Sequence, residues 1–166
     1  MTKKIENLKI IAIQPDTIWQ NSGENLLKCT AMLSDIHDPV DLILLPEMFS
    51  TGFCTEPEKL AETMDGETIR WMKRTAELYK CAVAGSLIIR ENKRYFNRLI
   101  FIDQYENFTW YDKRHLFTMD GEELKYTSGK ERLVVPLKGW QICFQICYDL
   151  RFPVWSRNRH DYDVLV

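Results

Sequence analysis

The amino-acid sequence predicts one domain of mixed α/β class in which strands outnumber helices. Short apolar runs rich in Ile, Leu, Val and aromatic residues recur along the chain, as is typical of strands. Two stretches between the first three runs space their apolar residues as a helix does. With 166 residues, 45% of them apolar and 28% charged, the chain is long enough to bury a core.

Apolar runs predict seven strands. In chain order they are LKIIAI (8–13), DLILLP (41–46), CAVAGSLII (81–89), RYFNRLIFID (94–103), FTWYDK (108–113), RLVVPL (132–137) and WQICFQIC (140–147). The last run alternates, so it should place Trp140, Ile142, Phe144 and Ile146 on one face and Gln141, Cys143, Gln145 and Cys147 on the other. The final residues, DYDVLV, resemble the opening of a further buried strand, and we expect residues 1–166 to be the N-terminal part of a longer domain.

Helical spacing predicts two crossover helices. The first lies within 22–38, with Ser22 near its start as a cap and a stripe of Leu26, Cys29, Leu33 and Ile36. The second lies within 67–80, with a stripe of Ile69, Met72, Ala76 and Tyr79. Alternation of strand and helix predicts parallel pairing in the first half of the chain, whereas the later runs are expected to form hairpins.

Charge and cysteine content exclude several classes of function. The 22 basic and 24 acidic residues nearly balance, which does not favour nucleic acid or an anionic membrane as a partner. The first apolar run is closed by Gln14 and Pro15 and is too short for a signal peptide or a membrane span, so we expect a cytoplasmic protein. Five scattered cysteines without a paired Cys-x-x-Cys motif predict reduced thiols and no zinc site.

Three reactive side chains follow predicted strands. Glu47 comes directly after DLILLP, where Pro46 has no amide hydrogen to donate to a sheet. Lys113 ends FTWYDK, and Cys147 ends WQICFQIC. Ligands of open α/β sheets bind at the carboxyl edge of the strands, so the three side chains are expected to meet at one site.

Each of these residues also has a structural interpretation. A cysteine that ends an apolar strand is often a small buried hydrophobe, the interpretation we keep for Cys29, Cys81 and Cys143. Glu47 alone suits a loop or a helix cap, and Lys113 alone suits the surface. What favours Cys147 as a nucleophile is a predicted strand-to-helix turn, with Asp149 as a cap and Pro153 early in a short helix, which would expose the thiol.

A Cys-His dyad is a further alternative, since His115 lies two residues after Lys113. The sequence places no Asn or Asp partner for this histidine. His37 and His160 lie in polar surroundings and are interpreted as surface residues.

Three segments, LLPEMFSTGF, YDKRHLFTMDGE and ICYDLRFPVW, resemble the signature segments of the nitrilase (carbon-nitrogen hydrolase) superfamily in the order Glu, Lys, Cys. The resemblance spans almost the whole chain. The residues around the cysteine and in HLFTMDGE are most similar to the omega-amidase branch, which hydrolyses the terminal amide of 2-oxo acid amides. It implies a four-layer αββα sandwich, of which this chain would hold the N-terminal part. It also implies a homodimer formed through the sheets, a small amide as substrate and no cofactor or metal.

The resemblance also implies catalytic roles. Cys147 would be the nucleophile that forms a thioester and releases ammonia, Glu47 the general base, and Lys113 the cation that stabilises the tetrahedral intermediate. The backbone amide of Tyr148 would be a second oxyanion donor. A further assisting glutamate is expected at Glu122, which lies seven residues before Gly129, with Glu123 as the alternative. A free thiol has a pKa of about 8.5, so it requires such a base or a nearby cation.

Substrate contacts are less defined by the sequence. Arg151 is expected either to pair with a substrate carboxylate or to hold Asp149 or a neighbouring loop. Phe49, Phe117 and Trp155 are candidates for the pocket wall, although aromatic residues beside a site often serve packing alone.

Three rival functions remain open at this point. A nitrilase or another amidase would share the catalytic residues and differ in its pocket. A catalytically silent form, serving as a scaffold or binding protein, would release no ammonia. A thiol redox or zinc protein would have to use Cys143 and Cys147, which have no second cysteine pair. If the chain is complete, we expect an exposed apolar edge.

Overall fold

Two β-sheets packed face to face form the framework of the protein, in a computed structural model that describes residues 7–166. The larger sheet has the order β1-β2-β3-β4-β5, formed by Ile10–Ala12, Leu42–Leu44, Ala82–Glu91, Arg94–Ile102 and Phe108–Asp112. The smaller sheet has the order β6-β7-β8, formed by Leu133–Leu137, Trp140–Phe144 and Val164–Leu165. The mixed α/β class is confirmed, and β8 occupies the DYDVLV segment predicted as a strand.

Strand direction decides which residues share an edge of the larger sheet. β1, β2 and β3 are parallel, β4 is antiparallel to β3, and β5 is antiparallel to β4. β5 therefore runs in the same direction as β2. Residues that follow β2, residues that follow β5 and the first residues of β4 consequently meet at one edge.

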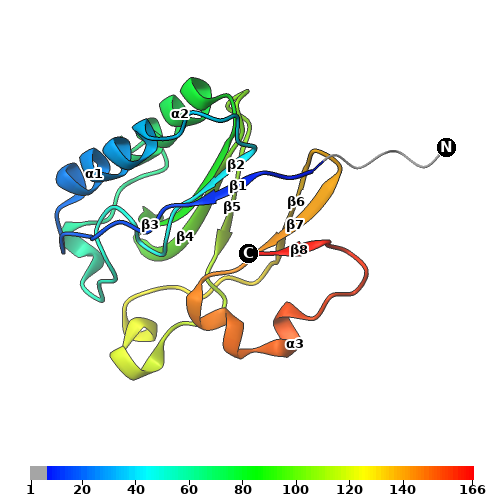
Figure 1. Cartoon of the computed structure of the whole chain (residues 1–166). Coiled ribbons are helices and arrows are strands. Elements are labelled where there is room, and N and C mark those ends of the chain that lie inside the picture. Colours follow the sequence, from blue (N-terminus) through cyan, green and yellow to red (C-terminus); the bar gives the residue numbers. More distant parts are fainter. Residues whose placement is uncertain (1–6) are drawn as a thin grey trace.

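Two helices cover the outer face of the larger sheet, α1 (Ser22–Ser34) and α2 (Glu67–Tyr79), as Figure 1 shows. Both predicted stripes face the sheet, because the cluster between helices and strands contains Leu26, Cys29, Leu33, Ile69, Met72 and Ala76. The predicted cap was one residue late: the side chain of Asn21, not Ser22, accepts the Glu24 amide at 3.2 Å. Since α1 ends at Ser34, Ile36 packs on the cluster from beyond the helix.

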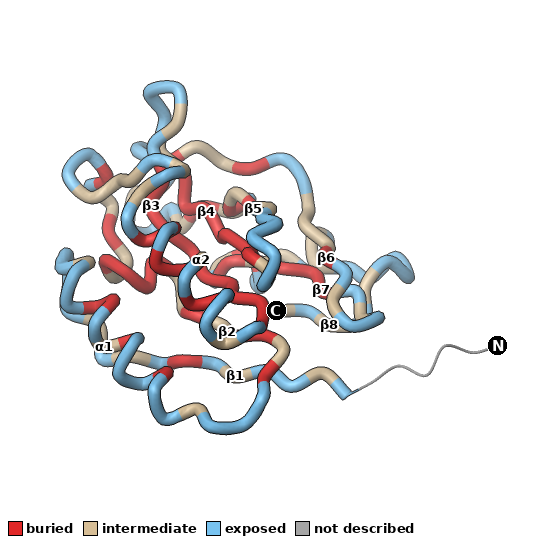
Figure 2. The backbone as a smooth tube through the Cα atoms, turned by 90° about the horizontal axis from the view of Figure 1, so that it is seen from above, coloured by how far each residue is buried: buried red, intermediate tan, exposed pale blue. Residues whose placement is uncertain are grey.

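Alternation in β3 and β4 builds a core on each face of the larger sheet. Val83 and Ile100 point toward the helices, whereas Ala84 and Phe101 point toward the smaller sheet. The rings of Phe101 and Phe144 lie 5.7 Å apart across the two sheets. Buried residues accordingly run along β2, β3, β4 and β7, and exposed ones along the outer sides of the helices (Figure 2). The described residues thus form three layers, in the order helices, larger sheet and smaller sheet.

The remaining helical segments are short. They are η1 (Pro57–Lys59), η2 (Thr118–Asp120), η3 (Glu122–Leu124), η4 (Cys147–Arg151) and α3 (Pro153–Ser156). α3 is the short helix predicted at Pro153. Among residues 7–166, none of the helices has both the length and the apolar character needed to cross a bilayer.

Two predictions about the segment after β7 were wrong. The strand ends at Phe144 and not at Cys147, because the Ile146 amide donates to the Asp149 carboxylate at 3.1 Å and so leaves the sheet. Asp149 was expected to cap the following helix. It lies instead inside η4 and is fully buried; it accepts the Ile146 amide at the start of η4 and also binds groups from other parts of the chain.

We predict that Gly129→Ala destabilises the fold. A Cβ at this position would lie 2.0 Å from the backbone oxygen of Asp112, and backbone atoms cannot move aside as a flexible side chain can. The free energy of unfolding, measured by urea titration, should fall by about 1 to 3 kcal/mol. Gly23→Ala is the matched control, because its nearest neighbour is 3.9 Å away and it lies in α1; it should be neutral or stabilise by up to about 1 kcal/mol. Equal effects of the two changes would contradict the prediction.

Candidate active site

The three reactive residues predicted at strand ends line one cavity of about 720 Å³. Glu47 follows β2, Lys113 follows β5, and Cys147 opens η4 after β7. The cavity wall consists of Glu47, Phe53, Lys113, Phe117, Met119, Asp120, Cys147, Tyr148, Leu150 and Arg151. Loops that leave both sheets therefore contribute to the same space.

The Lys113 ammonium lies between two carboxylates. Its Nζ is 2.7 Å from Glu47 Oε1 and 2.9 Å from Glu122 Oε2, and the side chain is only 1% exposed. Burial alone would lower the pKa of Lys113, but the charges and hydrogen bonds of the two carboxylates outweigh burial and raise that pKa. Of the two glutamates considered, Glu122 is fully buried at the site and Glu123 is exposed. A positive charge is therefore fixed at the cavity wall.

Asn97, near the start of β4, holds both carboxylates. Its Nδ2 donates to Glu47 Oε1 at 2.7 Å and to Glu122 Oε1 at 3.1 Å. Glu122 also accepts the Phe117 amide at 2.6 Å. Sequence reasoning missed Asn97. The available signal was an amide within the apolar run YFNRLIF, since a buried polar side chain requires partners.

Cys147 is exposed at the cavity and has a left-handed backbone, with φ of 43°. Met48, directly after Glu47, has φ of 46°. Residues other than glycine seldom adopt this conformation, and it is concentrated at functional sites. The sharp turn at Cys147 carries the chain from the sheet into η4 and leaves the thiol at the cavity. Tyr148 is the second residue of η4, where amide groups have no acceptor within the helix.

The pKa of the Cys147 thiol is raised above its ordinary value. Burial is the largest cause that raises its pKa, followed by the charge of Glu47 and a hydrogen bond to Glu47. Lys113 lowers the pKa but does not outweigh these effects. The nearby cation therefore does not offset burial and the Glu47 charge.

The buried carboxylate of Asp149 stabilises the turn that follows Cys147 through several hydrogen bonds. Asp149 accepts the Tyr111 hydroxyl at 2.7 Å, the His115 amide at 2.9 Å and the Ile146 amide at 3.1 Å. The His115 ring also contacts it, with Nδ1 2.7 Å from Oδ1, and stacks on Phe152 with centroids 3.7 Å apart. The structure thus gives His115 an aspartate partner that the sequence did not place. His115 is absent from the wall of the cavity that Cys147 lines, so the dyad alternative is not supported.

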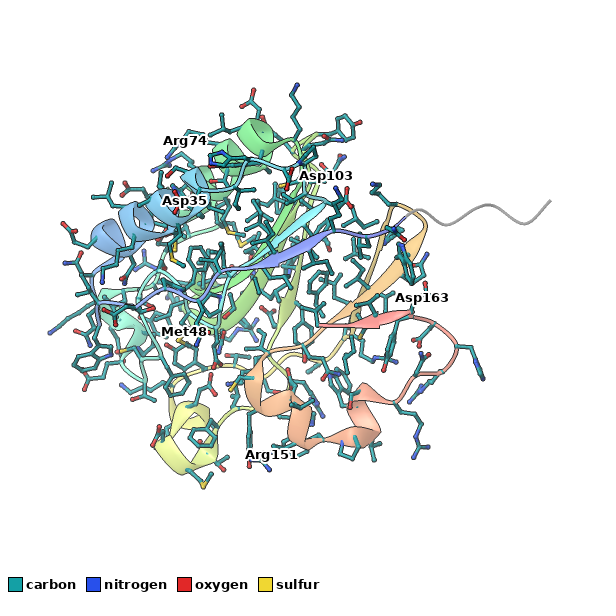
Figure 3. All side chains as sticks on the ribbon, in the orientation of Figure 1. Asp35, Met48, Arg74, Asp103, Arg151 and Asp163 are labelled. Atoms are coloured by element: carbon teal, nitrogen blue, oxygen red, sulfur yellow. The ribbon has the colours of Figure 1, made fainter. Side chains whose placement is uncertain are left out.

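Two of the four candidate substrate residues line the cavity. Phe117 is in its wall and packs edge-on against Tyr148 at 5.1 Å. Arg151 is also in its wall; Figure 3 labels it on η4, at the end of the molecule that also carries the turn 118–124. Its guanidinium forms no ion pair within residues 7–166. Arg151 therefore does not hold Asp149, whose oxygens are engaged elsewhere.

The expectations for Phe49 and Trp155 were wrong. Phe49 is fully buried in the core between the helices and the larger sheet, 5.8 Å from the Trp71 ring. The positive φ of Met48 turns the chain there, so Phe49 enters the core. Trp155 donates its Nε1 to the Tyr111 hydroxyl at 3.0 Å and packs with the smaller sheet. Phe53 takes the expected aromatic place in the cavity wall, with the Lys113 ammonium 5.5 Å above its ring.

The zinc alternative finds no support in the described part of the chain. Cys143 is fully buried, and Arg132 donates to its sulfur at 3.6 Å. No group of three or more His, Cys, Asp or Glu side chains in residues 7–166 is placed to hold a metal ion.

Comparison with known proteins identifies relatives of this chain. The family profile described as carbon-nitrogen hydrolase matches residues 9–166. Omega-amidase YafV of Yersinia enterocolitica is 40% identical over 162 residues, which cover 96% of this chain and 62% of that protein. The 2-oxoglutaramate amidase of Bacillus subtilis is 30% identical over 152 residues, which cover 90% of this chain and 59% of that protein.

The solved structure of a CN-hydrolase superfamily protein from Xanthomonas campestris shares the fold. Its TM-score is 0.90 at 42% sequence identity, and the match covers 93% of this chain and 58% of that one. The chain thus spans about 60% of the length of the relatives that it matches.

We predict that Glu47→Gln makes Cys147 more reactive toward iodoacetamide at pH 8. Removing the Glu47 charge removes one cause of the raised thiol pKa, so the thiolate forms at lower pH. The rate of carboxymethylation of Cys147, followed by peptide mass spectrometry from pH 6 to 10, should rise several-fold at pH 8. The exposed Glu123→Gln is the matched control and should leave the profile unchanged. A slower or unaltered reaction in Glu47→Gln would contradict this account.

Proposed function

Since the chain belongs to the carbon-nitrogen hydrolase family, we propose that it is an amidase that cleaves the carbon-nitrogen bond of a small amide through a thioester on Cys147. One observation carries the proposal. A buried ammonium, Lys113, is fixed between Glu47 and Glu122 at the wall of a cavity that also contains an exposed thiol. Base, cation and nucleophile are the groups that acyl transfer from an amide requires.

Acylation begins with proton transfer from Cys147 to Glu47. The sulfur then attacks the amide carbon, and the carbonyl oxygen becomes an oxyanion. The Lys113 ammonium and the Tyr148 backbone amide stabilise this oxyanion, which gains more in a desolvated site than in water, where the attraction is about 1 kcal/mol at contact. Glu47 returns its proton to the nitrogen as the carbon-nitrogen bond breaks. Ammonia leaves and the acyl group remains as a thioester.

Deacylation repeats the sequence with water as the nucleophile. Glu47 takes a proton from water, the resulting hydroxide attacks the thioester carbon, and Lys113 with Tyr148 again stabilises the oxyanion. The carbon-sulfur bond breaks, and the proton on Glu47 returns to the sulfur. The products are a carboxylic acid and the starting thiol, so no cofactor is consumed.

The two glutamates are proposed to have different roles. Glu122 accepts three N–H groups, from Lys113, Asn97 and the Phe117 amide, and is fully buried. Both N–H donors that bind Glu47 reach Oε1, which leaves Oε2 for the thiol proton. Glu47 is therefore the group that exchanges protons, whereas Glu122 fixes Lys113.

For the substrate, we propose the omega-amide of a 2-oxo acid. This class is supported by relatives named omega-amidase YafV and 2-oxoglutaramate amidase. It is also supported by Arg151 in the cavity wall, because its guanidinium pairs with no carboxylate of residues 7–166 and so suits a bidentate contact with a substrate carboxylate. The apolar side chains of Phe117 and Leu150 would contact the carbon chain between the two polar ends.

Assembly and location complete the proposal. A homodimer through the sheets is the state that the family resemblance implies, and light scattering of the purified protein tests it. A cytoplasmic location suits five cysteines that are all free thiols.

Cys147→Ala should abolish ammonia release from an omega-amide and leave the melting temperature nearly unchanged, because the thiol is exposed. We expect a loss of at least about 1,000-fold in kcat, as is usual for a removed nucleophile. The buried Cys54→Ala is the control and should retain activity. A full-rate Cys147→Ala variant would refute the proposed mechanism. Product analysis with a matched nitrile tests the nitrilase alternative, and release of ammonia from the nitrile but not from the amide would favour it.

Arg151→Met should raise KM for a carboxylate-bearing omega-amide about 10-fold or more, since a charge-assisted pair contributes about 1.5 to 3 kcal/mol. The same variant should hydrolyse an uncharged amide of equal length with unchanged KM. The exposed Arg157→Met serves as the charge-matched control. Equal changes of KM for both substrates would show that Arg151 does not recognise the carboxylate.

A further inference from the structure

Asn97 is in contact with all three residues of the ion cluster, Glu47, Lys113 and Glu122. Its side chain binds Glu47 and Glu122, and its backbone oxygen accepts the Lys113 amide at 2.9 Å. Asn97 pairs with Ile88 in the ladder of β3 and β4, and the side chain is fully buried. One residue on a central strand is thus connected to the loop after β2, the end of β5 and the segment 117–125.

The two carboxylates of the ion cluster require a second hydrogen-bond donor besides Lys113. Two carboxylates surround one ammonium, so their like charges repel each other at short range, and one cation does not balance both. An amide nitrogen carries two N–H groups, and Asn97 directs one to each carboxylate. It satisfies both acceptors without changing the net charge of the cluster.

The orientation of the Asn97 side-chain amide indicates that it is placed to bind the two carboxylates. Asn97 Oδ1 is buried without a hydrogen-bond partner in the described structure. An unpaired buried oxygen destabilises the fold, so this side chain is not placed for stability alone. Rotating the amide by half a turn would direct that oxygen at Glu47 and Glu122, where only donors are tolerated. The two carboxylates therefore determine the orientation.

We propose that Asn97 is a positioning residue that holds Glu47 and Glu122 in fixed places about Lys113 and so keeps Glu47 free to take the proton of Cys147. The proposal rests on the proposed function for its catalytic consequence. It adds a residue that contacts no substrate and acts through the general base. Its loss should reduce kcat more than it changes KM, because the cavity wall remains intact.

Asn97→Asp is the decisive variant. Its carboxyl has the shape of the amide but donates a hydrogen bond only when protonated. Relative to the unmodified protein, kcat for an omega-amide should fall at least about 10-fold at pH 8, with KM within about 3-fold, and the difference should narrow toward pH 5.5. Asn97→Ser introduces no buried charge, so it should disturb folding less. Its kcat should also fall, and this loss should not diminish at low pH. A purely structural role would produce no such pH dependence.

A second readout does not depend on the substrate. Carboxymethylation of Cys147 by iodoacetamide, followed against pH, should shift to higher pH by about one unit in Asn97→Asp, the usual size for a new like charge nearby. Asn25→Asp is the matched control, since Asn25 is also fully buried and donates to the backbone oxygens of Ile18 and Ser50. It should lower the melting temperature and leave the alkylation profile unchanged.

The outcomes separate this inference from the proposed function. An unshifted alkylation profile in Asn97→Asp, or kcat within about 3-fold in both Asn97 variants, would overturn the role of Asn97. If the unmodified protein releases ammonia from no amide, the proposed function fails. A shifted alkylation profile would still support the placement of Asn97 about the thiol and its base.

Discussion

The architecture of the site depends on one buried positive charge. An ammonium that is 1% exposed is costly unless carboxylates and hydrogen bonds compensate for lost water. Lys113 obtains this compensation only if the loop after β2 supplies Glu47 and the segment after η2 supplies Glu122. Formation of the ion cluster and docking of these segments are therefore one event. The position of the Glu47 carboxylate relative to the thiol follows from it.

Much of the framework follows from sequence pattern alone. Short apolar runs located the strands, and helical spacing located α1 and α2, because buried strands and amphipathic helices space their apolar residues differently. Glu47 and Lys113 were predicted at a shared edge, since polar residues that follow buried strands stay anchored while their loops diverge. The roles of these residues and of Cys147 remain proposals. Their convergence on one cavity agrees with the expected placement.

What the sequence did not reveal depends on local backbone turns and on partners distant in the chain. Phe49 follows a residue with positive φ, so its direction does not continue the pattern of the preceding strand. Asp149 was interpreted as a helix cap because caps are local. It does accept the Ile146 amide at the start of η4, but it also binds Tyr111 and His115, more than 30 residues away, which local pattern does not reveal. Asn97 lies within a strand, where period alone indicates burial and says nothing about what an amide binds.

The raised pKa of the Cys147 thiol has a consequence for its reaction with oxidants. Peroxide and other electrophiles attack thiolates, so a surface cysteine with a permanently lowered pKa is readily converted to sulfenic and sulfinic acids. Here the pKa is raised, although the sulfur is exposed at the cavity. A raised pKa keeps the thiolate fraction small, so oxidation of this accessible sulfur should be slower than that of a thiol with a lowered pKa.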